Sequence, residues 1–277
     1  MILSGFEKEM DAEGFFRTVV PDEELKSYAR EIETRISEIS LDPSVIGAGY
    51  SQDISMLISP GFTKYLTSIA EPLLRNKWVK KNLPFPRIVN IMCSYSFFNE
   101  EAVKNATHAH LWHRDLDDFG PQLKIFVPLT PCNEANGQFS CLSNRIAGWK
   151  DLLLDSELIR KLESSPEDEY RKSDGSNRIT DKTLRKSVPA NAILDFTSQI
   201  GDLLFIDTNS TYHKGGLILE NGSYRIMVQV TIGSATHAWY NPTSIATKAF
   251  QSVLRLYRSK FGKFTKIFNN RVPRYLG

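Results

Sequence analysis

The spacing of apolar positions along the chain changes once, close to Arg87. Before that point apolar residues recur every three or four positions, which is the spacing of a helix with one buried face. One such series begins at Leu25, behind two acidic residues that favour a helix N-terminus, and predicts a helix to about Ile39. A second series predicts a helix over Gly61–Trp78. A short strand is expected over Glu13–Val20, ahead of both helices.

After Arg87 the pattern becomes that of short strands. These segments are rich in β-branched and aromatic residues and are bounded by Gly, Pro, Asn or Asp. They are Ile88–Phe98, Leu111–Asp115, Lys124–Leu129, Gln138–Leu142, Leu203–Asp207 and Arg225–Ile232. Helices followed by many short strands predict one mainly β domain over the 277 residues, with an antiparallel barrel or double-sheet jelly roll as its core and helices packed outside.

A charged insertion at about residues 146–192 interrupts this series of strands. It is predicted to be partly helical, with loops at Ser164–Asp168 and Ser173–Asn177. Long loops usually have a function, so we expect a lid that excludes water from the mouth of the barrel. Arg145 and Trp149 are the candidates to contact an acidic or sugar-like substrate. A solvated helical flap is the alternative for the same segment.

The net charge of +2 hides a basic C-terminal segment. Lys248–Gly277 contains eight basic residues and no acidic one. We expect a C-terminal extension at about residues 244–277, in which a basic amphipathic helix packs on its own domain. Peripheral contact with an anionic membrane surface is the alternative. A nucleic-acid partner is not expected, because no known binding motif surrounds the basic residues.

The composition predicts a cytoplasmic protein. No apolar run is long enough to span a bilayer, and the first residues lack the apolar core of a signal peptide. The three cysteines form no CxxC pair, which favours reduced thiols inside the cell. The sequence also lacks a GxSxG elbow, a P-loop and a dinucleotide glycine fingerprint, so those chemistries are poorly supported.

His113 and Asp115 are candidates for a metal site. Residues i and i+2 of a strand project from the same face, so both side chains can reach one ion. Imidazole and carboxylate ligands suit Fe(II), but they also suit Zn or Mn. A surface histidine near an acidic turn gives the same short pattern, so these two residues alone do not decide between a metal site and a polar surface turn.

His213 and Arg225 sharpen the prediction. A buried strand over Leu203–Asp207 leads to His213 in a polar loop, and Arg225 begins the next strand 12 residues later. We expect the two strands to be neighbours, with Arg225 pointing into the same cavity as the metal. A buried guanidinium needs an anionic partner, and a dicarboxylic co-substrate can bind it bidentately. An internal ion pair is the alternative for Arg225. Two imidazoles and a carboxylate form the ligand set of non-haem iron oxygenases.

Around these residues the sequence resembles the phytanoyl-CoA dioxygenase-like family of Fe(II)/2-oxoglutarate oxygenases. Residues 13–25 are similar to the opening strand and helix of that family, and residues 112–115 to its first metal motif. Residues 136–145 are similar to its glycine-to-serine strand segment. Residues 201–213, followed by Arg225, resemble the second metal ligand and the 2-oxoglutarate clamp. The insertion and the C-terminal part are not covered by the resemblance.

The resemblance implies a double-stranded β-helix, another name for this jelly roll, that holds one Fe(II). His113, Asp115 and His213 would be its protein ligands. The co-substrates 2-oxoglutarate and O₂ would take the remaining positions, with the distal carboxylate of 2-oxoglutarate on Arg225. The implied reaction hydroxylates an unactivated C–H and releases succinate and CO₂. Halogenating relatives replace the carboxylate with a small residue, so the presence of Asp115 favours hydroxylation.

Two positions depart from the pattern of the family. Asn144 stands where many relatives have His, and Gly215 lacks the hydroxyl that often assists the 2-oxoglutarate carboxylate. The candidates to compensate for the missing hydroxyl are Gln229, Ser94 and Ser96. His110 corresponds to a family position that is often polar and close to the co-substrate, and simple solvent exposure is its alternative.

The substrate is expected to be a small molecule or one linked to a lipid or carrier. The basic C-terminus and the lid favour an anionic group on it. Desaturation, cyclisation or epimerisation would use the same residues, and the sequence does not separate these outcomes from hydroxylation. A cupin-like protein that binds metal without redox chemistry is the alternative from another class, and binding of 2-oxoglutarate at Arg225 discriminates between the two.

Overall fold

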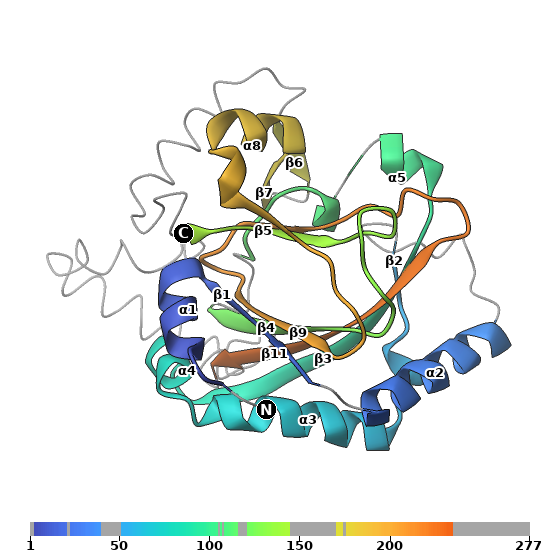
Figure 1. The fold of residues 1–277 in the computed structure, drawn as a ribbon, viewed down its shortest axis with the longest axis vertical. Coiled ribbons are helices and arrows are strands. Elements are labelled where there is room, and N and C mark those ends of the chain that lie inside the picture. The colour runs from blue at the N-terminus through green and yellow to red at the C-terminus, as the bar shows by residue number, and fades with distance from the viewer. Residues whose placement is uncertain are drawn as a thin grey trace, which may run out of the picture.

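Two antiparallel sheets form the body of the molecule (Figure 1). The structure is a computed structural model that describes residues 3–20, 23–39, 51–104, 106, 108–115, 121–144, 170–173 and 176–234. The strands of the larger sheet lie in the order β1 (Phe15–Val19), β9 (Asp202–Asp207), β4 (Gln122–Pro128), β11 (Tyr224–Ser234), β3 (Pro86–Phe97) and β2 (Ser51–Asp53). Those of the smaller sheet lie in the order β10 (His213–Gly215), β5 (Phe139–Leu142) and β8 (Ile193–Phe196). The predicted fold class, mainly β with flanking helices and a jelly-roll core, is confirmed.

The larger sheet separates an apolar core from the space between the two sheets. Alternate residues of β11 from Ile226 to Ile232 join the core on the outer face of the sheet. The residues that alternate with them, which include Arg225 and Gln229, therefore project towards the smaller sheet. Phe139 of β5 and Leu204 of β9 pack against each other in the space between the sheets. Polar residues of β11 thus lie inside the jelly roll, where the candidate site is found.

Four helices cover the outer face of the larger sheet (Figure 1). They are α1 (Phe6–Glu13), α2 (Glu23–Glu38), α3 (Pro60–Leu74) and α4 (Lys77–Asn82). α2 confirms the first predicted helix. The single helix predicted over Gly61–Trp78 is wrong, because the structure has two helices there, α3 and α4. The Asn76 side chain accepts hydrogen bonds from the backbone N–H groups of Trp78 and Val79. An asparagine at this position caps a new helix and ends the old one.

Leu111–Asp115 does not form the predicted strand. The segment makes only two isolated bridges, from Trp112 to Ile179 and from His113 to His213. It follows directly on the 3₁₀ helix η2 (His108–His110) and contacts a different partner on each side, so neither ladder extends. The other short elements of this half are η1 (Ser55–Leu57) and α5 (Glu100–Lys104).

β9 and β11 are not neighbours, contrary to the prediction. β4 lies between them, and it pairs with both. The reason is that consecutive strands of a jelly roll alternate between the two sheets. His213 accordingly does not lie in a loop but begins β10, in the smaller sheet.

The described part of the insertion packs on the outer face of the smaller sheet. It contains β6 (Tyr170–Ser173), β7 (Ser176–Ile179), α8 (Asp181–Ser187) and the 3₁₀ helix η4 (Ala190–Ala192). Its buried side chains share one apolar cluster with side chains of β5, β8 and the 111–115 segment. The members are Trp112, Leu142, Ile179, Leu184, Val188, Ile193 and Tyr212. Arg145, Trp149, the Ser164–Asp168 loop and the extension at about residues 244–277 lie outside the described residues.

The three cysteines are buried and form no disulfide, in agreement with the predicted reduced thiols. Burial is the main cause that raises the pKa of the Cys93 thiol to about 12, and it also raises the pKa of Cys132 and Cys141. In the ranges that the structure describes, no helix is both long and apolar enough to cross a membrane.

Gly14 links α1 to the sheet, and its replacement by Ala is expected to destabilise the protein more than the same change at Gly5. Both glycines have φ of +80°, which costs an alanine about 1 kcal/mol. A Cβ at Gly14 would also lie 2.1 Å from Thr211 Oγ1 and 2.4 Å from Asn144 Nδ2, whereas a Cβ at Gly5 meets nothing within 4 Å. Such crowding adds about 1–3 kcal/mol. Urea denaturation of both variants measures the difference, and equal losses would contradict the crowding.

Candidate metal centre

His113 and His213 are held side by side by their own backbones. The N–H of His113 donates to the carbonyl of His213 at 3.0 Å, and the N–H of His213 donates to the carbonyl of His113 at 2.9 Å. Asp115 is fixed in the same way, because its N–H donates to the carbonyl of Thr208 at 2.8 Å. Backbone hydrogen bonds therefore set the spacing of the three side chains.

Both imidazoles present the same nitrogen to Asp115. Nδ1 of His113 lies 2.8 Å from the carbonyl oxygen of Leu111, and Nδ1 of His213 lies 3.1 Å from that of Thr211. Each Nδ1 is thus assigned as the protonated donor, which leaves a lone pair on Nε2. Each Nε2 lies 3.6 Å from one oxygen of the Asp115 carboxylate. The ligand atoms all lie within 4.8 Å of one another, a spacing at which they can share one ion.

Burial and charge keep these groups in the forms that bind a metal. Burial is the largest cause that lowers the pKa of His113 and His213 from the usual 6.5, so both imidazoles are neutral at pH 7. Burial by itself raises the pKa of Asp115, but His213, Lys124 and His113 outweigh it and hold that pKa well below 3.8. Neutral imidazole and ionised carboxylate are the protonation states that metal binding requires.

Lys124 belongs to this site, although the sequence analysis did not identify it. Its Nζ lies 2.6 Å from Oδ2 of Asp115, and the lysine side chain is only 14% exposed. Lys124 projects from β4 into the space between the sheets, because its neighbours Leu123 and Ile125 point to the outer core. The sequence signal that could have identified Lys124 is a lysine on the inward face of a predicted strand. Its charge keeps Asp115 ionised and fixes one of the two carboxylate oxygens.

The segment that carries His213 is braced from two sides. The ring of Phe139 stacks on the His213 imidazole, with 5.7 Å between centroids and 15° between planes. Thr211, whose carbonyl fixes Nδ1 of His213, accepts a hydrogen bond from Asn144 Nδ2 at 3.3 Å. It also donates to the carbonyl of Gly14 at 3.3 Å. Asn144 thus supports the chain just before His213.

Arg225 is buried between the sheets, with only 8% of its surface exposed. Its Nη1 donates to the carbonyl oxygens of Gly137 and Gly216, and its Nη2 lies 3.5 Å from Ser96 Oγ. In the part of the chain that the structure describes, its Nε has no hydrogen-bond partner and no carboxylate pairs with the guanidinium. Burial lowers the pKa of Arg225, yet arginine stays charged in proteins. The internal ion pair is therefore not found among the described residues.

The other candidates for co-substrate contacts divide into two groups. His110 is buried beside Arg225, since its Nδ1 lies 3.1 Å from the carbonyl of Gly215. Ser96 also lies next to the guanidinium, as given above. Ser94 Oγ instead donates to the carbonyl of Met227 at 3.3 Å. Gln229 Nε2 donates to Thr231 Oγ1 at 3.2 Å, on the inward face of β11.

Asp181 connects the insertion to both histidine-bearing segments. It accepts hydrogen bonds from Trp112 Nε1 at 2.7 Å, from Arg185 Nε at 2.9 Å and from Lys214 Nζ. Lys214 Nζ also lies 5.2 Å from the centre of the Trp112 ring system. Trp112 directly precedes His113, and Lys214 directly follows His213. No local pattern in the sequence marks this carboxylate as part of the site, because Lys214 and Trp112 are 33 and 69 residues away from it along the chain.

Asp181→Asn is expected to destabilise the protein in a pH-dependent way. Burial by itself raises the pKa of Asp181, but hydrogen bonds from Lys214, Arg185 and Trp112 lower it from 3.8 to about 2. A depressed carboxyl pKa stabilises the fold above the unfolded value and loses that effect as the pH falls through the folded value. The difference in free energy of unfolding between parent and variant should be full at pH 7 and shrink from pH 4 to pH 2. Glu100→Gln, at the exposed pair with Lys104, is the control, and a difference between parent and Asp181→Asn that stays constant with pH would contradict the assignment.

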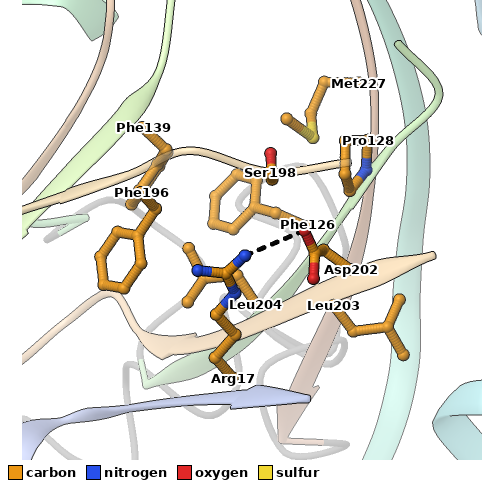
Figure 2. A pocket seen from close by; sticks show the side chains of 10 residues that line it. All are labelled: Arg17, Phe126, Pro128, Phe139, Phe196, Ser198, Asp202, Leu203, Leu204 and Met227. Atoms are coloured by element: carbon orange, nitrogen blue, oxygen red, sulfur yellow. Dashed lines mark hydrogen bonds and ion pairs between the residues drawn. The ribbon is translucent and has the colours of Figure 1, made fainter. Parts of the chain in front are cut away.

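A small hollow, lined in part by Phe139, is shown in Figure 2. Its volume is about 310 Å³, including space open to solvent. Arg17 and Asp202 form an ion pair of 2.9 Å at its wall, and the guanidinium of Arg17 points directly at the carboxylate. The other lining residues are Phe126, Pro128, Phe139, Phe196, Ser198, Leu203, Leu204 and Met227. None of the three candidate metal ligands lines this hollow.

Comparison with known proteins identifies the fold. No family model matches the sequence, and no curated protein matches it; the resemblance to phytanoyl-CoA dioxygenase-like proteins therefore stays a prediction. The non-heme alpha-ketoglutarate-dependent epimerase SnoN of nogalamycin biosynthesis is similar at 15% identity, over 84% of this chain and 83% of its own, with a TM-score of 0.54. EctD from S. alaskensis, with 2-oxoglutarate and 5-hydroxyectoine, is similar at 14% identity over 85% and 77%, with a TM-score of 0.53. HygX from Streptomyces hygroscopicus, with nickel and 2-oxoglutarate bound, is similar at 14% identity over 85% and 88%, with a TM-score of 0.52. The chain thus shares its jelly-roll fold with proteins that depend on 2-oxoglutarate or have been crystallised with it.

Proposed function

We propose that this protein is an Fe(II)- and 2-oxoglutarate-dependent oxygenase. The observation that carries the proposal is the convergence of His113, Asp115 and His213 inside a jelly roll that also buries Arg225 without a carboxylate partner among the described residues. One divalent ion and one dicarboxylate would satisfy both features. The shared fold supports this function, because several proteins with this fold depend on or bind 2-oxoglutarate.

The residues present fit a ferrous ion. Two neutral imidazoles and one carboxylate on one side of an ion leave its remaining positions open for co-substrates. Each imidazole is oriented by a backbone carbonyl, and Lys124 orients the carboxylate. These are the supporting hydrogen bonds that fixed metal ligands usually have. His113, Asp115 and His213 would hold the ion.

The residues around Arg225 fit 2-oxoglutarate. Gly215 is two residues after His213 on β10, or about 6.6 Å along the strand. A Cβ at Gly215 would lie 3.5 Å from Arg225 Nη2, so the guanidinium lies about one five-carbon dicarboxylate away from the ligand set. The distal carboxylate of 2-oxoglutarate could accept charged hydrogen bonds from the guanidinium of Arg225 there. Ser96 is the candidate to supply the hydroxyl that Gly215 lacks, because the Ser94 hydroxyl is bonded to Met227.

Hydroxylation of a C–H bond in a small or carrier-linked molecule is the outcome we propose. Fe(II) with 2-oxoglutarate and O₂ supplies the oxidising chemistry, and succinate and CO₂ leave. Asp115 and Lys124 keep a charged ligand at the ion, while Phe139 covers His213 on the inner side. SnoN is named an epimerase, so epimerisation, desaturation or cyclisation by the same residues is the alternative. We also propose that one domain spans residues 1–277, with the insertion at about 146–192 as its lid.

The decisive experiment is substrate-dependent succinate release across a panel of metabolites, with the mass of the product recorded. We expect release that requires added Fe(II) and 2-oxoglutarate together. A product heavier by one oxygen identifies hydroxylation, one lighter by two hydrogens identifies desaturation or cyclisation, and one of unchanged mass identifies epimerisation. Succinate release that survives both His113→Ala and Asp115→Ala would overturn the proposal.

The second candidate function is metal binding without redox chemistry, as in a cupin-like protein. The same three ligands would serve it, but a buried cation beside them would have no role. Calorimetry of the Mn(II)-loaded protein with 2-oxoglutarate separates the two functions. Metal binding with no measurable affinity for 2-oxoglutarate would favour the cupin-like protein.

A further inference from the structure

The insertion brings an arginine to the face of the histidine pair. β7 pairs with the segment that carries His113, because Trp112 and Ile179 exchange two backbone hydrogen bonds of 2.9 Å. The side chain of Ile179 is buried in the cluster around Trp112. Adjacent residues of a strand project to opposite sides, so Arg178 points away from that cluster. Trp112 and Ile179 form an antiparallel bridge, and His113 and Arg178 are the residues next to that bridge, one on each segment.

The charge of Arg178 acts on both histidines. It lowers the pKa of His113 and the pKa of His213, in each case after the larger effect of burial. Lys124 lowers the pKa of His213 from the side of the larger sheet. Two cations from different elements, Lys124 and Arg178, therefore act on the ligand set, and Lys124 is the one that pairs with Asp115. Whatever other contacts Arg178 makes, its field is present at both imidazoles.

We propose that Arg178 binds an oxyanion of the substrate, a phosphate or a carboxylate, at the face of the metal centre. The proposal rests on the proposed function and names the substrate class for it. A ferrous ion and the two carboxylates of 2-oxoglutarate cancel in charge, so loading the site does not change the net charge around Arg178.

Arg178 is held where it can select a substrate. A guanidinium offers a rigid fork that matches the two oxygens of a carboxylate or phosphate. The element that carries it is fixed by the Trp112–Ile179 bridge on one side and by Asp181, three residues later, on the other. Binding groups on rigid elements position their ligands more accurately than groups on free loops. The anion would bring the adjacent carbon atoms of the substrate to the metal centre.

The test uses the full-length protein loaded with Mn(II) and 2-oxoglutarate, with the protein in excess over the metal. Paramagnetic broadening of the ³¹P signal is measured for methyl phosphate and for the neutral trimethyl phosphate. Carboxyl-¹³C acetate is the second anionic probe, and it distinguishes a carboxylate site from a phosphate site. Arg178→Gln is compared with Arg87→Gln, at an exposed arginine of β3.

We expect at least one anionic probe to be broadened, the neutral ester to be unaffected, and Arg178→Gln to weaken the effect about tenfold. Arg87→Gln should behave as the parent. Equal broadening in the parent and in Arg178→Gln would mean that the anion ligates the ion directly, and it would overturn the assignment. Absence of broadening by both anions would do the same. If Mn(II) does not bind to the parent protein, the proposed function fails, and the inference that rests on it fails too.

Discussion

Asp115→Ala is expected to weaken binding of Mn(II), a stand-in for Fe(II), by at least about 100-fold. Loss of a single supporting hydrogen bond already costs 10- to 100-fold in metal affinity, and Asp115 is the only carboxylate of the triad. The variant would also leave the charge of Lys124 facing the ion in place of the charge of Asp115. Titration calorimetry of the metal-free protein at pH 7 measures the affinity. Unchanged affinity would exclude Asp115 as a ligand.

The same variant is expected to lower the free energy of unfolding by about 3 kcal/mol, because it leaves the buried Lys124 without its partner. The double variant Asp115→Ala, Lys124→Met removes both charges and should regain most of that stability. It should not regain the metal. Recovery of stability without recovery of binding separates the ligand role of Asp115 from its structural role. Glu71→Ala, at an exposed carboxylate of α3, is the control for the substitution itself.

Arg225→Ala is expected to weaken binding of 2-oxoglutarate to the Mn(II)-loaded protein by about 2–5 kcal/mol, or at least roughly 30-fold. Arg225 is buried, and its Nε has no partner among the described residues, so an anion beside it would gain a desolvated charged hydrogen bond. Metal affinity should stay within about threefold of the parent value, because Arg225 is not in the ligand set. Calorimetry with each ligand in turn gives both numbers.

Arg225→Lys is the informative companion, because it keeps the charge and loses the planar fork. We expect an affinity for 2-oxoglutarate between those of the parent and of Arg225→Ala. Arg17→Ala serves as the control, since Arg17 is partly exposed and pairs with Asp202 at the hollow. An Arg225→Ala protein that binds 2-oxoglutarate as tightly as the parent would remove the main support for the proposed co-substrate site.

Sequence patterns identified those parts of the site that depend on strand alternation. His113 and Asp115 were predicted to share an ion because residues i and i+2 face one way, and the structure brings both to His213. The prediction reached this result even though their segment is no strand. What fixes it is a pair of backbone hydrogen bonds to a residue 100 positions later, which no local pattern encodes.

Contacts between distant segments explain what the sequence analysis missed or misplaced. Asp181 and Arg178 act at the site only because the insertion folds back on Trp112, and their local sequence is that of a charged surface segment. The prediction that β9 and β11 are neighbours is wrong, because it assumed that strands close in sequence pair with each other. α2 was predicted well, since its helical spacing is local and uninterrupted. The break at Asn76 depended on one capping side chain.

The bridge between His113 and His213 places the candidate metal centre where two segments that are remote in the sequence meet. An ion bound by both imidazoles would close a loop of about one hundred residues. Because the unfolded chain cannot present all three ligands together, occupancy and folding become linked, and an ion at 100 times its dissociation constant adds about 2.7 kcal/mol to stability. Thermal melting with and without a chelator would then report how much of the protein carries metal. Preparations that lose the ion would become easier to unfold and to digest at the mouth of the barrel.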